Sequence, residues 1–157
     1  MVAITLPDGA VRHYDGHPTG YEIAQHISPS LAEQAVAIKI NGKLADLVLP
    51  ITQDTHIEII TRTSEEGLEI LRHDAAHVLA EAVKELYPQA QITIGPAIEH
   101  GFYYDIYYPP SFTPDDLLRL EQRMHEIVAR NEPIIREVWA RDKACLLYTS
   151  DAADDTP

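Results

Sequence analysis

The sequence has one cysteine, no long apolar run and few basic residues, and each shortage excludes a class of protein. The single cysteine, Cys145, cannot form a disulfide within the chain, which suits a reducing cytosol. No apolar stretch approaches the roughly 20 residues that a membrane-spanning helix requires. Residues 1–8 carry neither a basic start nor a long apolar core, so they are not a secretory signal peptide. We therefore expect a cytoplasmic protein with no membrane partner.

Basic residues are outnumbered, 12 Lys and Arg against 25 Asp and Glu, which gives a net charge of -13. Acids exceed bases in each of the segments 1–63, 64–143 and 144–157. On charge alone, nonspecific binding to nucleic acid or to a membrane surface is disfavoured. A nucleic-acid partner would need a local basic patch, or a further domain to hold it.

What the sequence does have, in its first part, is short alternating apolar runs separated by turn signals, and these predict strands. The runs lie at residues 2–6, 10–14, 35–40, 43–49 and 56–61. Thr19 and Glu22 have the spacing of a capping box and predict a helix between the second and third runs, which Pro29 ends. Asn41-Gly42 is a favoured pair in two-residue hairpin turns.

The predicted order is strand, strand, helix, strand, short strand, strand, which is the chain order of a β-grasp, ubiquitin-like fold. A chain of 157 residues with 45% hydrophobic residues can hold such a domain and a second small one. We predict the α+β fold class, with the β-grasp domain at residues 1–62. In its last strand, the alternation places Ile57 and Ile59 inward and Ile60 outward.

The second part, residues 63–143, begins with a long helical pattern from Ser64, an N-cap residue type, to the helix-breaking Pro88. One apolar stripe is predicted to face the core: Leu68, Leu71, Ala75, Val78, Leu79, Ala82 and Leu86. His73 and His77 lie one turn apart, roughly opposite that stripe. Small apolar residues stand beside them: Ile70, Ala76 and Ala80. A second layer is therefore expected to pack on the histidine face.

Further strands and a second helix follow in the same part. The strands are predicted at residues 91–94, 101–108 and 133–139. Thr113-Pro114 marks the start of the helix, and Asn131 can cap its end. Its core stripe is predicted to comprise Leu117, Leu120, Met124, Ile127 and Val128. Gly95-Pro96 is typical of a turn.

The two imidazoles of His73 and His77 can bind one metal ion or share one polar substrate. A zinc site usually needs three or four protein ligands, and the HExxH peptidase pattern needs Glu where this chain has Asp74. The residues alone leave metal binding, substrate positioning, and a pair of surface or interlayer histidines all open.

These motifs resemble the N-terminal part of bacterial threonyl-tRNA synthetases over residues 1–143. The first 62 residues are similar to that family's TGS domain. The motifs that carry the resemblance are Ile4–Gly9, Val36–Asp46, Glu66–Ile70 with His73 and His77, Ile94–Pro96, and Gly101–Asp105. Because a TGS domain also occurs in unrelated enzymes, the order of the motifs is more specific than any one of them.

The resemblance implies that residues 63–143 are the first half of an editing domain, with His73 and His77 as the catalytic half-site and Tyr104 lining the substrate pocket. The other half in the family is a Cys-x-x-x-His motif. The family's full-length enzyme joins threonine to tRNA(Thr) with ATP, Mg2+ and Zn2+, hydrolyses mischarged Ser-tRNA(Thr), and dimerises through a domain not matched here. This chain is expected to hold none of these cofactors and to be inactive by itself.

Two alternatives stay open: a standalone TGS module that docks on RNA or the ribosome, and a freestanding aminoacyl-tRNA editing hydrolase. Residues 144–157 join no periodic pattern and resemble a translated sequencing adapter. We interpret them as a non-native tail, with a disordered natural tail as the alternative.

Overall fold

A computed structural model describes residues 1–135 and 137–145 of the chain. These residues form two compact units. The first comprises residues 1–74 and 97–102, and the second comprises residues 75–96 and the described residues from 103 to 145. The predicted domain boundary after residue 62 stays a prediction, and the predicted non-native tail lies outside the described residues from position 146.

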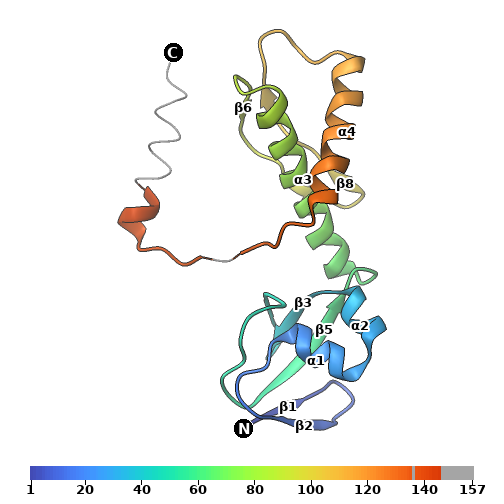
Figure 1. The fold of residues 1–157 in the computed structure, drawn as a ribbon, viewed down its shortest axis with the longest axis vertical. Helices are drawn as coiled ribbons and strands as arrows, with labels where there is room; N and C mark the ends of the chain where they lie inside the picture. The colour runs from blue at the N-terminus through green and yellow to red at the C-terminus, as the bar shows by residue number, and fades with distance from the viewer. Residues whose placement is uncertain (136, 146–157) are drawn as a thin grey trace. The chain divides into compact units, whose positions relative to one another are not determined.

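The first unit is built on a five-stranded sheet with the strand order β2-β1-β5-β3-β4 (Figure 1). Its strands are β1 (Val2–Thr5), β2 (Val11–Tyr14), β3 (Ala35–Ile40), β4 (Lys43–Ala45) and β5 (Thr55–Thr61). The first and last strands, β1 and β5, are parallel neighbours at the centre, and every other pair is antiparallel. This arrangement confirms the predicted α+β, β-grasp fold.

Turn chemistry in this sheet follows the sequence closely. Asn41 and Gly42 both have positive φ, at 49° and 81°, as the hairpin between β3 and β4 requires. The Asn41 side chain also accepts a hydrogen bond of 3.2 Å from the backbone N–H of His56, which fixes the turn to β5.

Two helices follow β2 where the sequence predicted one. Helix α1 (Gly20–Ile27) starts with the predicted capping box, since the Thr19 backbone N–H donates to Glu22 and the Glu22 N–H donates to Thr19 Oγ1. Pro29 does follow the end of α1, but it also begins α2 (Pro29–Gln34), which is capped by Ser28. The second helix was missed because proline suits the first turn of a helix as well as ending the previous one.

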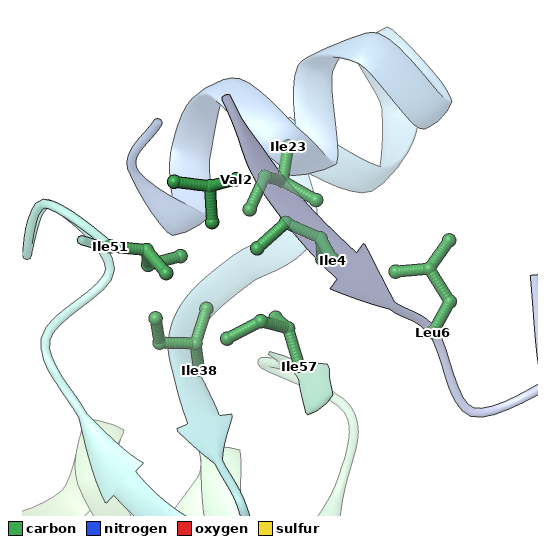
Figure 2. Packing of buried hydrophobic residues seen from close by; sticks show 7 residues of the cluster. All are labelled: Val2, Ile4, Leu6, Ile23, Ile38, Ile51 and Ile57. Atoms are coloured by element: carbon green, nitrogen blue, oxygen red, sulfur yellow. The ribbon is translucent and has the colours of Figure 1, made fainter. Parts of the chain in front are cut away.

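A compact apolar cluster fills the space between α1 and one face of the sheet (Figure 2). It consists of Val2, Ile4, Leu6, Ile23, Ile38, Ile51 and Ile57. The prediction that Ile60 points outward is wrong, since this residue is 2% exposed. It pairs with the buried Ala37, next to a β-bulge in the pairing of β3 with β5. Both faces of this end of the sheet are therefore covered. An ion pair joins Lys39 of β3 to Glu66 near the start of α3 (Glu65–Leu86).

In the second unit, the C-terminal part of α3 packs beside α4 (Pro114–Arg130) (Figure 1). The buried residues of this core are Ala82, Val83, Tyr87, Ala90, Leu120 and Ile127. Ion pairs along the two helices link Arg130 to Glu81 and Glu85, and Arg123 to Glu85, at 2.8–3.2 Å. No helix among the described residues is both long and apolar enough to cross a membrane.

The helix starts were predicted well, and the core stripes less well. Ser64 caps α3 through its hydroxyl, and Thr113 and Asp116 form a capping box on α4. Asn131 ends α4 in the left-handed conformation, as predicted. The stripe residues that are exposed instead of buried are Leu68, Leu71, Leu117 and Val128. Val128 is 65% exposed although its neighbour Ile127 is 8% exposed, so on α4 the core covers a narrower face of the helix than the predicted stripe.

Strand predictions in the second part were too long. The segment 101–108 holds two short strands, β8 (Gly101–Phe102) paired with β7 (Ala97–Ile98), and β9 (Ile106–Tyr107) paired with β6 (Gln91–Ile92). The described part of segment 133–139 is exposed and not a strand. Apolar, β-prone residues form a strand only where another strand offers hydrogen-bond partners, and none does so here among the described residues.

Candidate functional site

The two candidate catalytic residues, His73 and His77, lie on the continuous helix α3 and are both exposed. Their separation of four residues places them one turn apart on the same helix face, as predicted. Ala76 is 1% exposed, but Ile70 and Ala80 are only half-buried and both histidines are exposed, so the expected second layer does not cover the histidine face among the described residues. An imidazole can donate and accept hydrogen bonds, and the use of both rings by one polar ligand stays a prediction.

Metal binding at His73 and His77 stays an open prediction. Within residues 1–135 and 137–145, no three His, Cys, Asp or Glu side chains form a group that could hold a metal ion. A zinc site at His73 and His77 would need ligands that these residues do not supply.

The third candidate, Tyr104, is half-buried and packs directly on Gly95. A Cβ at position 95 would overlap the tyrosine ring, so only glycine fits beneath it. Hydrogen bonds on either side close the hairpin, with the Asp105 N–H donating to the Ile94 carbonyl at 2.8 Å and the Thr93 N–H donating to the Asp105 carbonyl at 3.1 Å. The predicted Gly-Pro turn and aromatic segment are thus brought together, with the Tyr104 ring held in place.

Comparison with known proteins shows what these elements are similar to. The family model of the TGS domain matches residues 2–61. The threonine–tRNA ligase of Rhodospirillum rubrum is 57% identical over 149 residues, which cover 95% of this chain and 23% of that protein. Those of Paramagnetospirillum magneticum (56% over 155 residues, 98% of this chain and 24% of the protein) and Rickettsia akari (53% over 150 residues, 96% and 24%) are also similar.

The chain matches the N-terminal part of threonine–tRNA ligases. It spans about a quarter of the length of these relatives, 23–24%. The five-stranded sheet with α1 and α2 is its TGS domain. The roles of His73, His77 and Tyr104 stay predictions, because neither the fold nor the similarity tests them.

A further group of polar side chains on the TGS domain was not predicted from the sequence. Arg12, His13, Tyr14, Asp15 and His26 line one open hollow, named here the β2–α1 hollow. The Tyr14 and His26 rings stack with centroids 5.6 Å apart and planes at 22°. No sequence spacing indicates this pairing, because it arises from the packing of α1 beside β2.

Proposed function

We propose that this chain supplies the TGS domain and the first half of the editing site of a threonine–tRNA ligase. The observation that carries the proposal is the 57% identity over 95% of the chain, which extends through helix α3 and its exposed histidine pair. On this proposal, residues 63–143 belong to the editing domain. The whole enzyme joins threonine to tRNA(Thr) with ATP and Mg2+, and acts as a homodimer through a part outside this chain.

An editing site is needed because binding alone cannot distinguish serine from threonine well enough. Serine differs from threonine by one methyl group, and binding distinguishes such a difference by only about 10–200-fold. A second site that hydrolyses Ser-tRNA(Thr) removes the errors that binding admits.

In this proposal, His73 and His77 orient the mischarged ester and the attacking water, because imidazoles serve well as hydrogen-bond partners and proton acceptors. Tyr104, held against Gly95, forms one wall of the pocket. The Zn2+ of the family belongs to the synthetic site, and no metal step is assigned to the residues described here, which offer no suitable ligand group.

The proposal is tested by exchanging this chain for the matching segment of the Rhodospirillum rubrum enzyme. His73→Ala and His77→Ala in this chimera are each expected to slow Ser-tRNA(Thr) hydrolysis about 100-fold or more, while threonylation is retained. His125→Ala, which changes an exposed histidine of α4, is the matched control and should leave both activities unchanged. Deacylation that is undiminished in both test variants contradicts the proposed roles.

Assays of the isolated chain distinguish the proposed function from the two alternatives, a freestanding editing hydrolase and a docking module. It is expected not to hydrolyse Ser-tRNA(Thr), because half of the editing groups are missing. Hydrolysis by residues 1–157 would instead indicate a freestanding editing enzyme. If the chimera fails to edit while the chain binds RNA or ribosomes, a docking module is the better description.

A further inference from the structure

The first half of helix α3 belongs to the same compact unit as the TGS sheet. The helix is continuous over 22 residues, but its residues up to Asp74 group with the first unit and those from Ala75 group with the second. His73 therefore lies in the unit of the TGS sheet, and His77 lies in the other. The contacts that hold the first half of α3 to the sheet also decide where the His73 ring lies.

The joint between β5 and α3 is a tight turn closed on the carbonyl group of Thr61, the last residue of β5. The backbone N–H and the hydroxyl of Ser64 both donate to this carbonyl, at 3.0 and 2.8 Å. The same hydroxyl accepts a hydrogen bond of 3.1 Å from the Gly67 N–H. The first turn of α3, whose N–H groups have no partner within the helix, is thus bonded to the end of the central strand.

Gly67 is buried and lies directly against the Thr61 carbonyl group. A Cβ at this position would overlap the carbonyl carbon and oxygen, which are backbone atoms that no side-chain rotation can move aside. Glycine is a poor helix former compared with alanine, so this position gives up helix stability for a closer approach to the sheet. Glycine is what allows α3 to start this close to β5.

A second contact attaches the same turn to the neighbouring strand. Lys39 of β3 forms an ion pair with Glu66, and their side chains are 21% and 40% exposed. Since β3 pairs with β5, the start of α3 is attached to two adjacent strands of the TGS sheet. Two attachment points on different strands fix the direction of a helix as well as its position.

Apolar packing holds this half of α3 only in part, because Leu68 and Leu71 are 40% and 39% exposed. His73 lies six residues beyond Gly67, which is about 9 Å along the helix axis. A change in the direction of the helix at its start is carried along this distance to the His73 ring. A misplacement of about 1 Å at a reacting group can lower a rate by about 100-fold.

We propose that Lys39, Ser64 and Gly67 are positioning residues for the editing reaction, which act through the first half of α3 to fix the His73 ring. The TGS sheet is then a rigid support for one of the two editing histidines. This inference rests on the editing role proposed for His73 and deepens it.

The test uses the chimera of this chain with the Rhodospirillum rubrum enzyme. Gly67→Ala is expected to lower kcat for Ser-tRNA(Thr) hydrolysis about tenfold, with KM changed by less than about twofold and threonylation retained. Alanine favours a helix more than glycine does, so a weaker helix cannot explain such a loss. Glu69→Ala, at an exposed residue in the same half of α3, is the matched control and should leave kcat within about twofold.

The ion pair provides a second test that leaves the backbone of the joint unaltered. Lys39→Glu and Glu66→Lys should each lower kcat for editing about threefold, because each places two like charges side by side. The double variant restores the attraction and should recover at least about half of the wild-type kcat. A double variant that is no better than the single ones contradicts the role of this pair.

Hydrogen exchange of the 157-residue chain measures the attachment without any enzymatic activity. Gly67→Ala should speed amide exchange of residues 68–74 about tenfold and leave that of β5 unchanged. Unchanged exchange, or an unchanged kcat in a chimera whose editing is abolished by His73→Ala, overturns this inference and leaves the proposed function in place. An editing rate that His73→Ala does not lower overturns the proposed role of His73, and this inference with it.

Discussion

The two compact units bury their apolar side chains in different ways. In the first, a five-stranded sheet and helix α1 enclose a cluster in which Ile4, Ile23 and Ile38 are fully buried. In the second, the described strands form one pair, β6 with β9, and the core lies largely between α3 and α4. Apolar side chains near its end, such as Ile134 and Val138, are exposed.

Because of this difference, the two units are stabilised by different interactions. The first is held by a continuous ladder of backbone hydrogen bonds over a closed core, which is insensitive to salt. The second depends more on packing between two helices and on half-exposed ion pairs of Arg130 and Arg123 with α3. Such pairs contribute little individually and are screened by salt.

The largest expected effect is that of a cavity in the first core. Ile38→Ala, at a residue that is 0% exposed, should lower the free energy of unfolding by about 4 kcal/mol. Ile134→Ala, at a residue that is 84% exposed, should change it by less than about 0.5 kcal/mol. Urea unfolding followed by circular dichroism measures both. Equal effects would show that the two parts do not differ in packing.

Hydrogen exchange should separate the two units directly. Amides of β1, β3 and β5 are expected to exchange about 100-fold or more slowly than those of α4, because opening the sheet requires the whole domain to unfold. Mass spectrometry of peptides from the intact chain provides the rates. Similar protection in both units would remove the basis for the comparison.

A smaller effect is expected where Tyr104 packs on Gly95. Gly95→Ala should destabilise the hairpin by about 1–3 kcal/mol, because its Cβ would overlap the ring. The same substitution made in a Tyr104→Ala background should cost much less, since the overlapping ring is gone. Thermal unfolding of the four proteins in this cycle gives the coupling, and an unchanged cost in both backgrounds would show that the contact is unimportant.

The smallest expected effect is a change in how folding stability depends on pH in acid. Hydrogen bonds from Tyr87 and Thr113 lower the pKa of Asp116 from 3.8 to about 2. A carboxyl group whose pKa is lower in the folded state stabilises the fold above its unfolded pKa, and this stability is lost as the pH falls through about 2. Asp116→Asn should therefore reduce the loss of stability between pH 4 and pH 2. An unchanged acid profile would contradict this contribution.

Local chemistry made much of the fold predictable. The capping boxes at Thr19 and Thr113 and the Asn41-Gly42 turn depend on residues close in sequence, and the structure has them as expected. The burial of Ile60 and the short strands after Gly101 depend on what packs against them from elsewhere in the chain. A pattern with a period of two residues cannot reveal a bulge or a missing partner strand.

In the candidate site, too, features set by local sequence were predictable and features set by long-range packing were not. Helical spacing was enough to place His73 and His77 on one exposed face of α3, and the resemblance supplied the roles proposed for them. The β2–α1 hollow was not predictable, because Tyr14 and His26 meet only after α1 has packed beside the sheet.

The parallel pairing of β1 with β5 has a consequence for synthesis of the protein. Ile4 aligns with Thr55, and the Ala3 N–H donates to the side chain of Asp54, which is 51 residues further along the chain. The centre of the sheet therefore cannot assemble on the ribosome until translation has passed Thr61 and this segment has left the exit tunnel. Until then the nascent β1–β2 hairpin has an unsatisfied edge, and closure of the domain is a late, long-range event in its folding.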